Sequence, residues 1–362
     1  MTLWRIKGHC TAMNLDGKKV LIIQLQYIGD TIAIIPLVEN LKGKIPTATV
    51  DLMLNQGTES LLAHHPDIRK IWKYDRATAK VNILSQLRYS INLIGRLRAE
   101  KYDVVICLTA GDRASFLSFA TGASLRLTHY SSSNLSRLLM NQFVRLGEGE
   151  TPHFVDYHLE MLRFWGFGNF KKNFTIHIPP PVAAEIDKQL AGAGISEGSL
   201  LVALHPGARK KWRQWPPERF AQIARLLKDR YQAAIILVGG PGEEELVRNV
   251  ESNMGFPPAL QSNSLNLLEM ASLFARCRLF IGNDSAPGHI ASAVACPTLT
   301  LFGPTFPQLS RPYGANGEVI FKNLPCCGCR QEDEFCLRPQ NTCMQLIEVD
   351  EVWEKVETLL TA

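Results

Sequence analysis

Four short segments combine chemically active side chains with the small residues that tight turns require. They are residues 26–30 (QYIGD), 205–213 (HPGARKKWR), 239–245 (GGPGEEE) and 283–289 (NDSAPGH). Each follows a short apolar run and lies before or at the start of a stretch with helical spacing, which predicts a position at the carboxyl end of a strand. Carboxylates, cations and helix-end N–H groups at such positions are suited to proton transfer and to binding phosphate.

The first segment offers a candidate general base. Gly29 allows a tight turn, and Asp30 stands at the start of the next helix. Aspartate is a favoured helix N-cap residue, whereas a carboxylate at the mouth of a ligand cleft is suited to accept a proton. The sequence leaves both interpretations open.

The second and third segments supply cations and a further carboxylate. His205 and Gly207 open a loop that also carries Lys211 and Arg213. Several cations at the end of a strand suit a diphosphate, although a solvated basic loop has the same composition. Glu243 follows a glycine-rich turn, where it either holds ribose hydroxyls or complements the dipole of the helix that begins there.

The fourth segment is the most informative of the four. It contains Asp284, Ser285, Ala286 and His289 at the opening of a helix. Small residues let a ligand approach the backbone, and the helix N-terminus presents free N–H groups and a partial positive charge to phosphate. The Ser285 hydroxyl adds a hydrogen-bond donor.

Alternating strands and helices predict a parallel sheet, covered on both faces, in each half of the chain. Strands are expected at residues 20–25, 48–54, 68–74, 103–108, 200–204, 233–238, 279–281 and 298–302. Helices are expected at residues 31–42, 83–100, 113–121, 217–230, 243–252, 267–276, 287–295 and 348–360. Prolines 179–181 predict a hinge within residues 174–182, since no helix or central strand tolerates them in its interior.

The length of 362 residues suits two domains. We expect an N-terminal Rossmann-like domain over residues 1–178, of which 1–17 are an extension, and a C-terminal one over 179–347. A helix over 348–362 is expected to pack back on the N-terminal domain. Ligands of open parallel sheets bind outside the carboxyl ends of the strands, so the cleft between the domains is the expected site.

The first βα turn lacks the Gly-x-Gly-x-x-Gly pattern, and a Walker motif is missing, which disfavours a nicotinamide dehydrogenase or a P-loop ATPase.

The net charge of +5 is unevenly distributed. Residues 80–145 hold nine Lys and Arg but three acids, a sector that is either a solvated face or an attraction for an anionic partner. Nucleic acid is disfavoured as the partner because no RNA or DNA recognition motif accompanies this basic sector.

Neither a span of about 20 apolar residues nor a signal-peptide core at the N-terminus is present, so we expect a cytoplasmic protein.

The four segments together resemble glycosyltransferase family 9, the ADP-heptose:lipopolysaccharide heptosyltransferases. The resemblance runs from about residue 19 to the last helix and includes residues 28–30 with 36–37, 205–208 with 215–216 and 219–220, 239–243, and 284–289 with 301–305. It implies the GT-B fold, in which two Rossmann-like domains face each other across a cleft.

The resemblance also implies roles for single residues. Asp30 matches the family's catalytic base, Glu243 the residue that holds the nucleotide ribose, and Asp284 with His289 the donor-binding pair. Ser285 and the backbone of Ala286 match the diphosphate contacts, with glycine usual in the family where Ala286 stands, and Gly288 replaces a larger residue. Arg213 stands where the family usually has a lysine that neutralises the departing phosphate, a role that Lys211 could also fill.

The implied reaction is an inverting, metal-independent transfer of heptose from ADP-heptose to a lipopolysaccharide inner-core acceptor. The basic N-terminal half then faces an anionic glycolipid, with peripheral contact to the cytoplasmic face of the inner membrane. The alternatives are a protein O-heptosyltransferase of the same family, a UDP-sugar epimerase on the same fold, and a nucleotide-binding module without turnover. No cofactor is expected for catalysis.

Five of the nine cysteines gather in residues 326–343. We expect Cys327, Cys329, Cys336 and Cys343 to hold a structural zinc or iron ion, because clustered thiols in a cytosolic protein suggest metal. Reduced structural thiols remain the alternative, since the spacing lacks a Cys-x-x-Cys pair.

Overall fold

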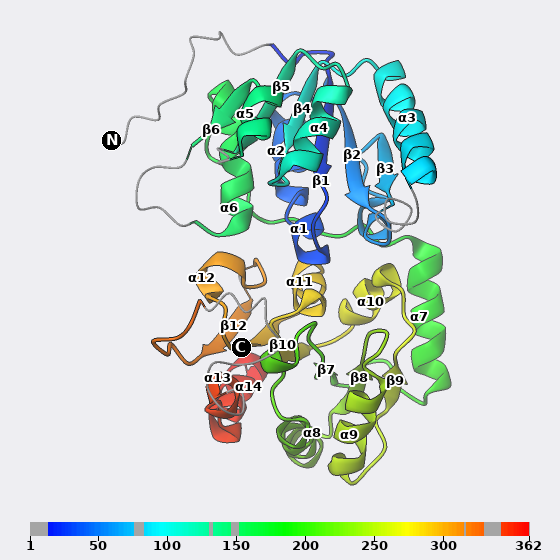
Figure 1. Cartoon of the computed structure of the whole chain (residues 1–362). Helices are drawn as coiled ribbons and strands as arrows, with labels where there is room; N and C mark the ends of the chain where they lie inside the picture. Colours follow the sequence, from blue (N-terminus) through cyan, green and yellow to red (C-terminus); the bar gives the residue numbers. More distant parts are fainter. Residues whose placement is uncertain are drawn as a thin grey trace. The chain divides into compact units, whose positions relative to one another are not determined.

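Each half of the chain is built on its own parallel sheet (Figure 1). The computed structural model describes residues 14–75, 83–129, 133–145, 152–314, 316–328 and 342–361. Within it, the chain divides into two compact units, Met1–His177 and Ile178–Ala362.

The first unit holds a six-stranded sheet in the order β3-β2-β1-β4-β5-β6, with every neighbouring pair parallel. Its strands are β1 Lys19–Gln24, β2 Thr49–Asn55, β3 Lys70–Tyr74, β4 Val104–Cys107, β5 Leu125–His129 and β6 Gln142–Val144. Its helices are α1 Ile28–Ile32, α2 Ile35–Lys44, α3 Ile83–Ala99, α4 Asp112–Ala120, α5 Asn134–Leu139 and α6 Phe154–Leu159, with 3-10 turns η1 Glu59–Leu62 and η3 Glu160–Trp165. The central strands β1 and β4 are continuous apolar runs because both faces of the sheet are covered.

The second unit repeats this plan in the order β12-β11-β10-β7-β8-β9. Its strands are β7 Leu201–His205, β8 Ala234–Val238, β9 Leu260–Ser262, β10 Leu279–Asn283, β11 Thr298–Phe302 and β12 Gly317–Phe321. Its helices are α7 Pro180–Gly192, α8 Pro217–Tyr231, α9 Glu244–Met254, α10 Leu267–Phe274, α11 Ala286–Ala293, α12 Pro307–Ser310, α13 Thr342–Gln345 and α14 Val349–Thr361, with 3-10 turn η4 Lys211–Arg213. Among the described helices, none combines the length and the apolar character that crossing a bilayer requires.

One local expectation was wrong. The stretch expected as one helix over residues 31–42 forms two, α1 and α2, and Pro36 lies in the first turn of the second, where a missing N–H costs nothing. The prolines expected to mark a hinge lie directly after the end of the first unit at His177. Pro179 is the N-cap of α7 and Pro180 its first residue, so they lie at a helix start and not in a helix interior. Proline thus marks helix starts at both places.

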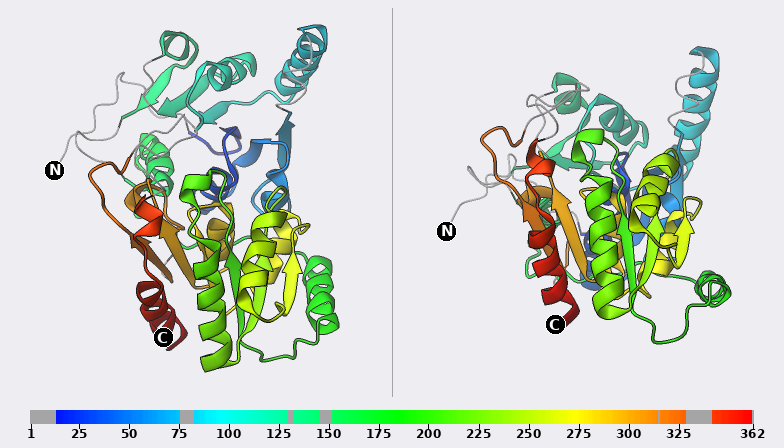
Figure 2. Two further views of the ribbon diagram at one scale, coloured as in Figure 1. Left: turned by 60° about the horizontal axis from the view of Figure 1, so that its bottom comes forward. Right: turned by 90° about the horizontal axis from the view of Figure 1, so that it is seen from below.

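The last helix, α14, contributes to the core of the second unit. That it also packs back on the first unit stays a prediction. Val352, Trp353 and Val356 are buried in the cluster that also contains Trp215 and Phe220. Figure 2 shows α14 (dark red) beside α8, and these two helices are in contact.

A buried carboxylate organises the edge of the first sheet. Asp51 on β2 is fully buried and receives two hydrogen bonds from Arg69, at 2.9 Å to Oδ1 and 2.5 Å to Oδ2. The hydroxyl of Tyr102 donates to the same Oδ2 at 2.5 Å and accepts from the indole N–H of Trp72 at 2.7 Å. Burial and the neighbouring Asp51 raise the pKa of Tyr102, so its hydroxyl stays protonated and can donate.

We predict that Asp51→Ala lowers the free energy of unfolding of the first unit by about 2–3 kcal/mol, because the buried Tyr102 hydroxyl loses its acceptor. Denaturant unfolding followed by tryptophan fluorescence measures the change. Lys73→Gln is the control, since it removes a more exposed pair with Glu59 (2.8 Å) and should cost less than about 1 kcal/mol. Equal losses in the two variants would contradict the prediction.

Candidate functional site

The segments singled out in the second half of the chain meet at the carboxyl edge of the second sheet. His205 is the last residue of β7, Asn283 is the last of β10, and Gly239 follows β8. β7 and β10 are neighbours, and the strand order reverses between them. In open parallel sheets, the crevice for a ligand forms at this kind of reversal.

The amide of Asn283 holds the β7 and β10 ends together. Its Oδ1 accepts a hydrogen bond from the backbone N–H of Trp215 (3.0 Å), and its Nδ2 donates to the carbonyl of Pro206 (2.7 Å). Trp215 is fully buried, and its indole N–H donates to the carbonyl of Ile347 (2.9 Å). The basic loop between Pro206 and Trp215 is therefore fixed at both ends, a role that the sequence analysis did not assign to Asn283.

His205, Glu243 and Ser285 form the first group of contacts. His205 Nε2 lies 3.1 Å from Glu243 Oε2, and Ser285 Oγ lies 3.3 Å from His205 Nδ1. The backbone N–H of Gly240 donates to the same Glu243 oxygen at 2.7 Å. Burial opposes ionisation of Glu243, but the bond and charge of His205 together with the Gly240 bond outweigh it and lower the pKa of this carboxyl. Glu243 is thus a fixed carboxylate.

Gly207 makes room for that carboxylate. A Cβ atom placed on residue 207 would collide with the carboxylate of Glu243, whereas one on Gly240 would lie at an ordinary contact distance of 3.4 Å from Glu243 Oε2. Gly207 is therefore needed for a close approach, as expected of a glycine in a ligand-binding turn.

Asp284, Arg213 and Thr305 form the second group. Arg213 Nη1 lies 3.1 Å from Asp284 Oδ2, and the Thr305 hydroxyl donates to the same oxygen at 2.5 Å. Burial raises the pKa of Asp284, and the charge of Arg213 and the Thr305 bond only partly oppose this. The sequence analysis missed Thr305 as a site residue, although it lies within the 301–305 motif of the resemblance.

The start of helix α11 lies next to both groups. Ser285 is its N-cap residue, but its hydroxyl turns to His205 and to the Asn283 carbonyl rather than capping a helical N–H. Ala286 is the first residue of the helix, and His289 lies one turn further on. Burial lowers the pKa of His289 to about 4, so the ring is neutral at pH 7. Because the Ser285 hydroxyl bonds elsewhere, it caps none of the backbone N–H groups in the first turn of α11.

Lys211 and Arg213 differ in their surroundings. Both lie in the 3-10 turn η4, but the Lys211 side chain is exposed and Arg213 is partly buried against Asp284. The guanidinium of Arg213 is thus positioned by a carboxylate, and Lys211 is the more accessible cation of the two.

In the first unit, Gly29 and Asp30 also lie at a reversal of strand order, between β1 and β4. Asp30 is the third residue of α1, not its N-cap, which is Tyr27. Asp30 Oδ2 accepts the backbone N–H of Tyr27 at 3.0 Å, so the carboxylate does cap the helix start from within. Burial raises the pKa of Asp30, although the backbone hydrogen bonds oppose it, which makes the carboxylate a better proton acceptor near neutral pH than an ordinary aspartate.

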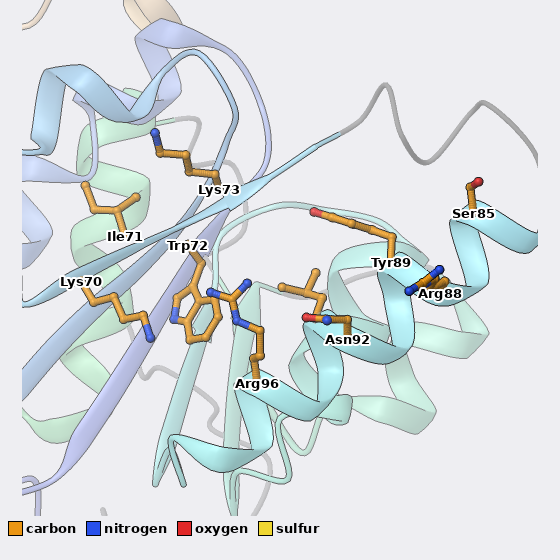
Figure 3. A pocket seen from close by; sticks show the side chains of 10 residues that line it. Lys70, Ile71, Trp72, Lys73, Ser85, Arg88, Tyr89, Asn92 and Arg96 are labelled. Atoms are coloured by element: carbon orange, nitrogen blue, oxygen red, sulfur yellow. The ribbon is translucent and has the colours of Figure 1, made fainter.

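A basic pocket of about 630 Å³ lies between the edge strand β3 and helix α3 of the first unit (Figure 3). Its lining consists of Lys70, Ile71, Trp72, Lys73, Ser85, Arg88, Tyr89, Asn92, Leu93 and Arg96. Lys70 and Lys73 are paired with Glu100 (2.7 Å) and Glu59 (2.8 Å). Figure 3 shows Lys73 on the face of β3 opposite to Trp72, so the cations on the side of α3 are Lys70, Arg88 and Arg96. No carboxylate is among these described lining residues, and the pocket is suited to an anion.

The arginines expected to serve the basic sector have separate roles. Arg96 extends toward Trp72, with its guanidinium 5.1 Å from the ring centroid (Figure 3). Arg98 instead donates to the carbonyl of Ala120 (2.9 Å), and Arg126 donates to those of Leu139 and Ala123 (2.8 and 2.6 Å). Arg98 and Arg126 therefore satisfy helix-end and turn carbonyls, whereas Arg88 and Arg96 of the same basic sector line the pocket.

Two of the four cysteines expected to bind metal are described. Cys327 Sγ lies 3.7 Å from the carbonyl oxygen of Gly303, and a Cβ on Gly303 would lie 3.3 Å from Cys343 Sγ, so both thiols are next to this glycine. Cys329 and Cys336 lie outside the described residues. The metal site at these cysteines therefore stays a prediction.

Comparison with known proteins identifies the family. The model of glycosyltransferase family 9 (heptosyltransferase) matches residues 90–337. The chain belongs to this family. Lipopolysaccharide heptosyltransferase 3 of Escherichia coli is 28% identical over 296 residues, which are 81% of this chain and 85% of that protein.

Solved structures of this family share the fold. The family 9 glycosyl transferase of Veillonella parvula is similar with a TM-score of 0.84 at 24% identity, over 97% of this chain and 99% of that one. E. coli heptosyltransferase WaaC with ADP gives a TM-score of 0.75 at 17% identity, over 94% and 99%. The present chain is therefore a glycosyltransferase of the GT-B class, as the sequence predicted.

We predict that Asp284→Asn leaves the melting temperature of the second unit unchanged or raises it at pH 7. The pKa of Asp284 is higher in the folded than in the unfolded chain, so ionisation costs stability once the pH exceeds about 4, the unfolded value. The gain in stability from asparagine at position 284 should therefore be present at pH 7 and disappear as the pH falls toward 4. Thermal melts at both pH values test this, and a clear loss of stability at pH 7 would show that Asp284 is structurally required.

Proposed function

We propose that this protein transfers heptose from ADP-heptose to a lipopolysaccharide inner-core acceptor, with inversion at the anomeric carbon and without a catalytic metal. Membership of the family and the similarity to lipopolysaccharide heptosyltransferase 3 of E. coli support heptose transfer. The observation that carries the proposal is the pairing of His205 with Glu243 and of Arg213 with Asp284 at the reversal between β7 and β10. This arrangement provides a fixed carboxylate, a cation and helix-end N–H groups for a nucleoside diphosphate.

In the proposed donor complex, Glu243 accepts the ribose hydroxyls, which are hydrogen-bond donors suited to a carboxylate whose pKa is lowered. The diphosphate lies at the first turn of α11, near Ser285 and the backbone of Ala286, where the helix dipole and the free N–H groups favour negative charge. His205 positions both Glu243 and Ser285 through its two ring nitrogens. Asp284 and His289 complete the proposed donor site.

The leaving ADP requires positive charge as the glycosidic bond breaks. Arg213, oriented by Asp284, and the more exposed Lys211 are the proposed sources of that charge. With the α11 N–H groups they take the part that a metal ion plays in other transferases. Arg213 is thus the cation that a carboxylate holds in place, and Lys211 is the more exposed cation.

Asp30 is the proposed base. Its raised pKa and its fixed position through the Tyr27 N–H suit it to take the proton from the attacking acceptor hydroxyl. The reaction requires Asp30 to reach an acceptor that also meets the donor held by the second unit. Attack from the face opposite the departing diphosphate inverts the configuration.

The acceptor proposed for the basic pocket carries phosphate or carboxylate groups. Arg88 and Arg96 give the pocket two cations in addition to Lys70, and Asn92 and Tyr89 add polar groups from α3. Such a lining is suited to an anionic glycolipid presented at the cytoplasmic face of the inner membrane, with which the protein would make peripheral contact. The proposed zinc or iron at Cys327, Cys329, Cys336 and Cys343 is structural and takes no part in the reaction.

The deciding experiment incubates the purified protein with ADP-heptose and an inner-core glycolipid and follows ADP release and product mass. Product mass increased by one heptose supports the proposal. Transfer to a protein acceptor instead would establish a protein O-heptosyltransferase, and conversion of a UDP-sugar without acceptor would establish an epimerase. Stabilisation by ADP without any turnover would leave a binding module.

We predict that Asp30→Asn lowers kcat about 10²- to 10⁴-fold, the usual contribution of a general base, and leaves ADP binding intact. Asparagine keeps the oxygen that accepts the Tyr27 N–H, so the start of α1 is preserved. ADP at a hundredfold excess over its dissociation constant should still stabilise this variant by about 2.7 kcal/mol, whereas Asp284→Ala should lose the stabilisation.

The acid limb of the pH–rate profile provides the internal check on Asp30. Because its pKa is raised, activity of the native enzyme should fall as the pH drops through a value above the ordinary aspartate range near 3.8. The residual activity of Asp30→Asn should lack this limb. A variant with near-native kcat would remove Asp30 from the mechanism and leave it as a helix cap.

We predict that the double variant Arg88→Ser/Arg96→Ser raises the KM for the glycolipid acceptor at least tenfold and leaves the KM for ADP-heptose unchanged. Each arginine supplies a charge-assisted contact to an anion, worth about 1 kcal/mol or more. Lys42→Ser/Lys44→Ser on α2 is the charge-matched control. If both double variants change the acceptor KM equally, the effect is one of net charge and the pocket is not the acceptor site.

A further inference from the structure

Three side chains outside the proposed transferase site meet in the first unit. Glu39 lies on α2, His65 follows the turn η1, and His177 is the last residue of the unit. The three offer one ligand atom each, and these atoms lie within 4.8 Å of one another. Segments distant in the sequence therefore bring two imidazoles and one carboxylate together.

His65 is the buried member of this cluster. Its side chain is 2% exposed, and its Nδ1 accepts the backbone N–H of Asp67 at 3.2 Å. Its Nε2 points toward Glu39, but the distance of 3.6 Å to Oε1 is too long for a hydrogen bond, and Nε2 has no hydrogen-bond partner among the described residues. A buried nitrogen without a hydrogen-bond partner calls for an explanation.

The other two members can move toward a common point. Glu39 and His177 are partly exposed, and the His177 ring packs edge-on against His65 with centroids 5.0 Å apart. The backbone around them is held, because the amide of Asn40, next to Glu39, bonds the N–H and the carbonyl of Lys171 (2.8 and 2.7 Å). The segment that leads to His177 is thus fixed along α2 while the two ligand side chains keep rotational freedom.

We propose that Glu39, His65 and His177 bind a divalent transition-metal ion of the zinc class, with water as the fourth ligand. Two histidines and one glutamate are a common donor set for zinc. Tetrahedral binding at about 2.0–2.2 Å from each ligand places the donor atoms roughly 3.5 Å apart. The 3.6 Å between His65 Nε2 and Glu39 Oε1 already matches this spacing, and a separation at the 4.8 Å limit would have to close by about 1 Å.

Binding at His65 Nε2 has one definite cost. Because Nδ1 accepts from Asp67, the neutral ring carries its proton on Nε2, and the metal takes that position. The ring proton then moves to Nδ1, which gives up the 3.2 Å contact with the Asp67 N–H. One long hydrogen bond is exchanged for a metal bond at a nitrogen that otherwise has no partner.

The ion would cross-link three segments of the first unit and fix the chain directly before Ile178, where the second unit begins. Its three ligands all belong to the first unit and none of them is a residue of the proposed donor site, so the role we assign to the ion is structural. The inference goes beyond the proposed function and does not depend on it.

The test titrates the metal-stripped full chain with Zn²⁺ by calorimetry and with Co²⁺ by visible absorption. Wild type should show a site whose Co²⁺ spectrum has the d–d bands of nitrogen and oxygen ligands without thiolate charge transfer, which separates it from any site at the cysteines. His177→Ala and Glu39→Gln should each weaken this site at least about tenfold, since even groups that only support a ligand change affinity by that factor.

His64→Ala is the matched control, because His64 is the exposed neighbour of His65 on the same turn. It should leave stoichiometry and affinity unchanged, and Zn²⁺ should raise the melting temperature of wild type and of this control but not of His177→Ala. His65→Ala should bind metal as weakly as His177→Ala if it folds. If it does not fold, His177→Ala and Glu39→Gln test the proposal without it. Absence of a nitrogen and oxygen site in wild type, or equal binding by His177→Ala and His64→Ala, would overturn the proposal.

Discussion

The amide of Asn283 is the interaction on which the second unit's site depends. A parallel sheet brings strand ends to one edge, but the loops that leave those ends carry backbone groups that must be satisfied once they are buried. Asn283 satisfies one such group on either side of the basic loop, at Pro206 and at Trp215. The buried Trp215 in turn links the loop to the carbonyl of Ile347. A loop rich in cations is thereby held in one conformation before any anion arrives, which reduces the ordering cost of binding.

Most of the fold could be predicted from the sequence, because buried parallel strands are continuous apolar runs and the helices between them show apolar spacing. Among the strands that escaped prediction, β6, β9 and β12 lie at sheet edges and are only partly buried, which leaves a weak apolar pattern. β5 also escaped prediction although it is an internal strand, because Arg126, Thr128 and His129 interrupt its apolar run. The break between α1 and α2 was also hidden, because Ile32 and Ile35 are both buried and keep the apolar pattern intact across it. Pro36 was the available signal.

The site could be predicted as a set of residues but not as a set of contacts. Turn composition and the family motifs indicate His205, Glu243 and Asp284, since small residues and acids after a strand have few other uses. Which side chains pair depends on strand order, and strand order leaves no local trace in the sequence. Thr305 reaches Asp284 because β11 neighbours β10. His177 escaped notice for the same reason, as its partner His65 lies more than a hundred residues away and neither occurs in a motif.

The close approach at Gly207 has a consequence for how this site can change over evolutionary time. The carboxylate of Glu243 occupies the volume that a side chain at 207 would fill. The two positions are therefore a single unit of variation: a methyl group at 207 displaces the carboxylate from His205, and a shorter acid at 243 leaves the histidine without its partner. Relatives that lack one member should lack the other, and libraries that vary this turn should randomise the two codons jointly.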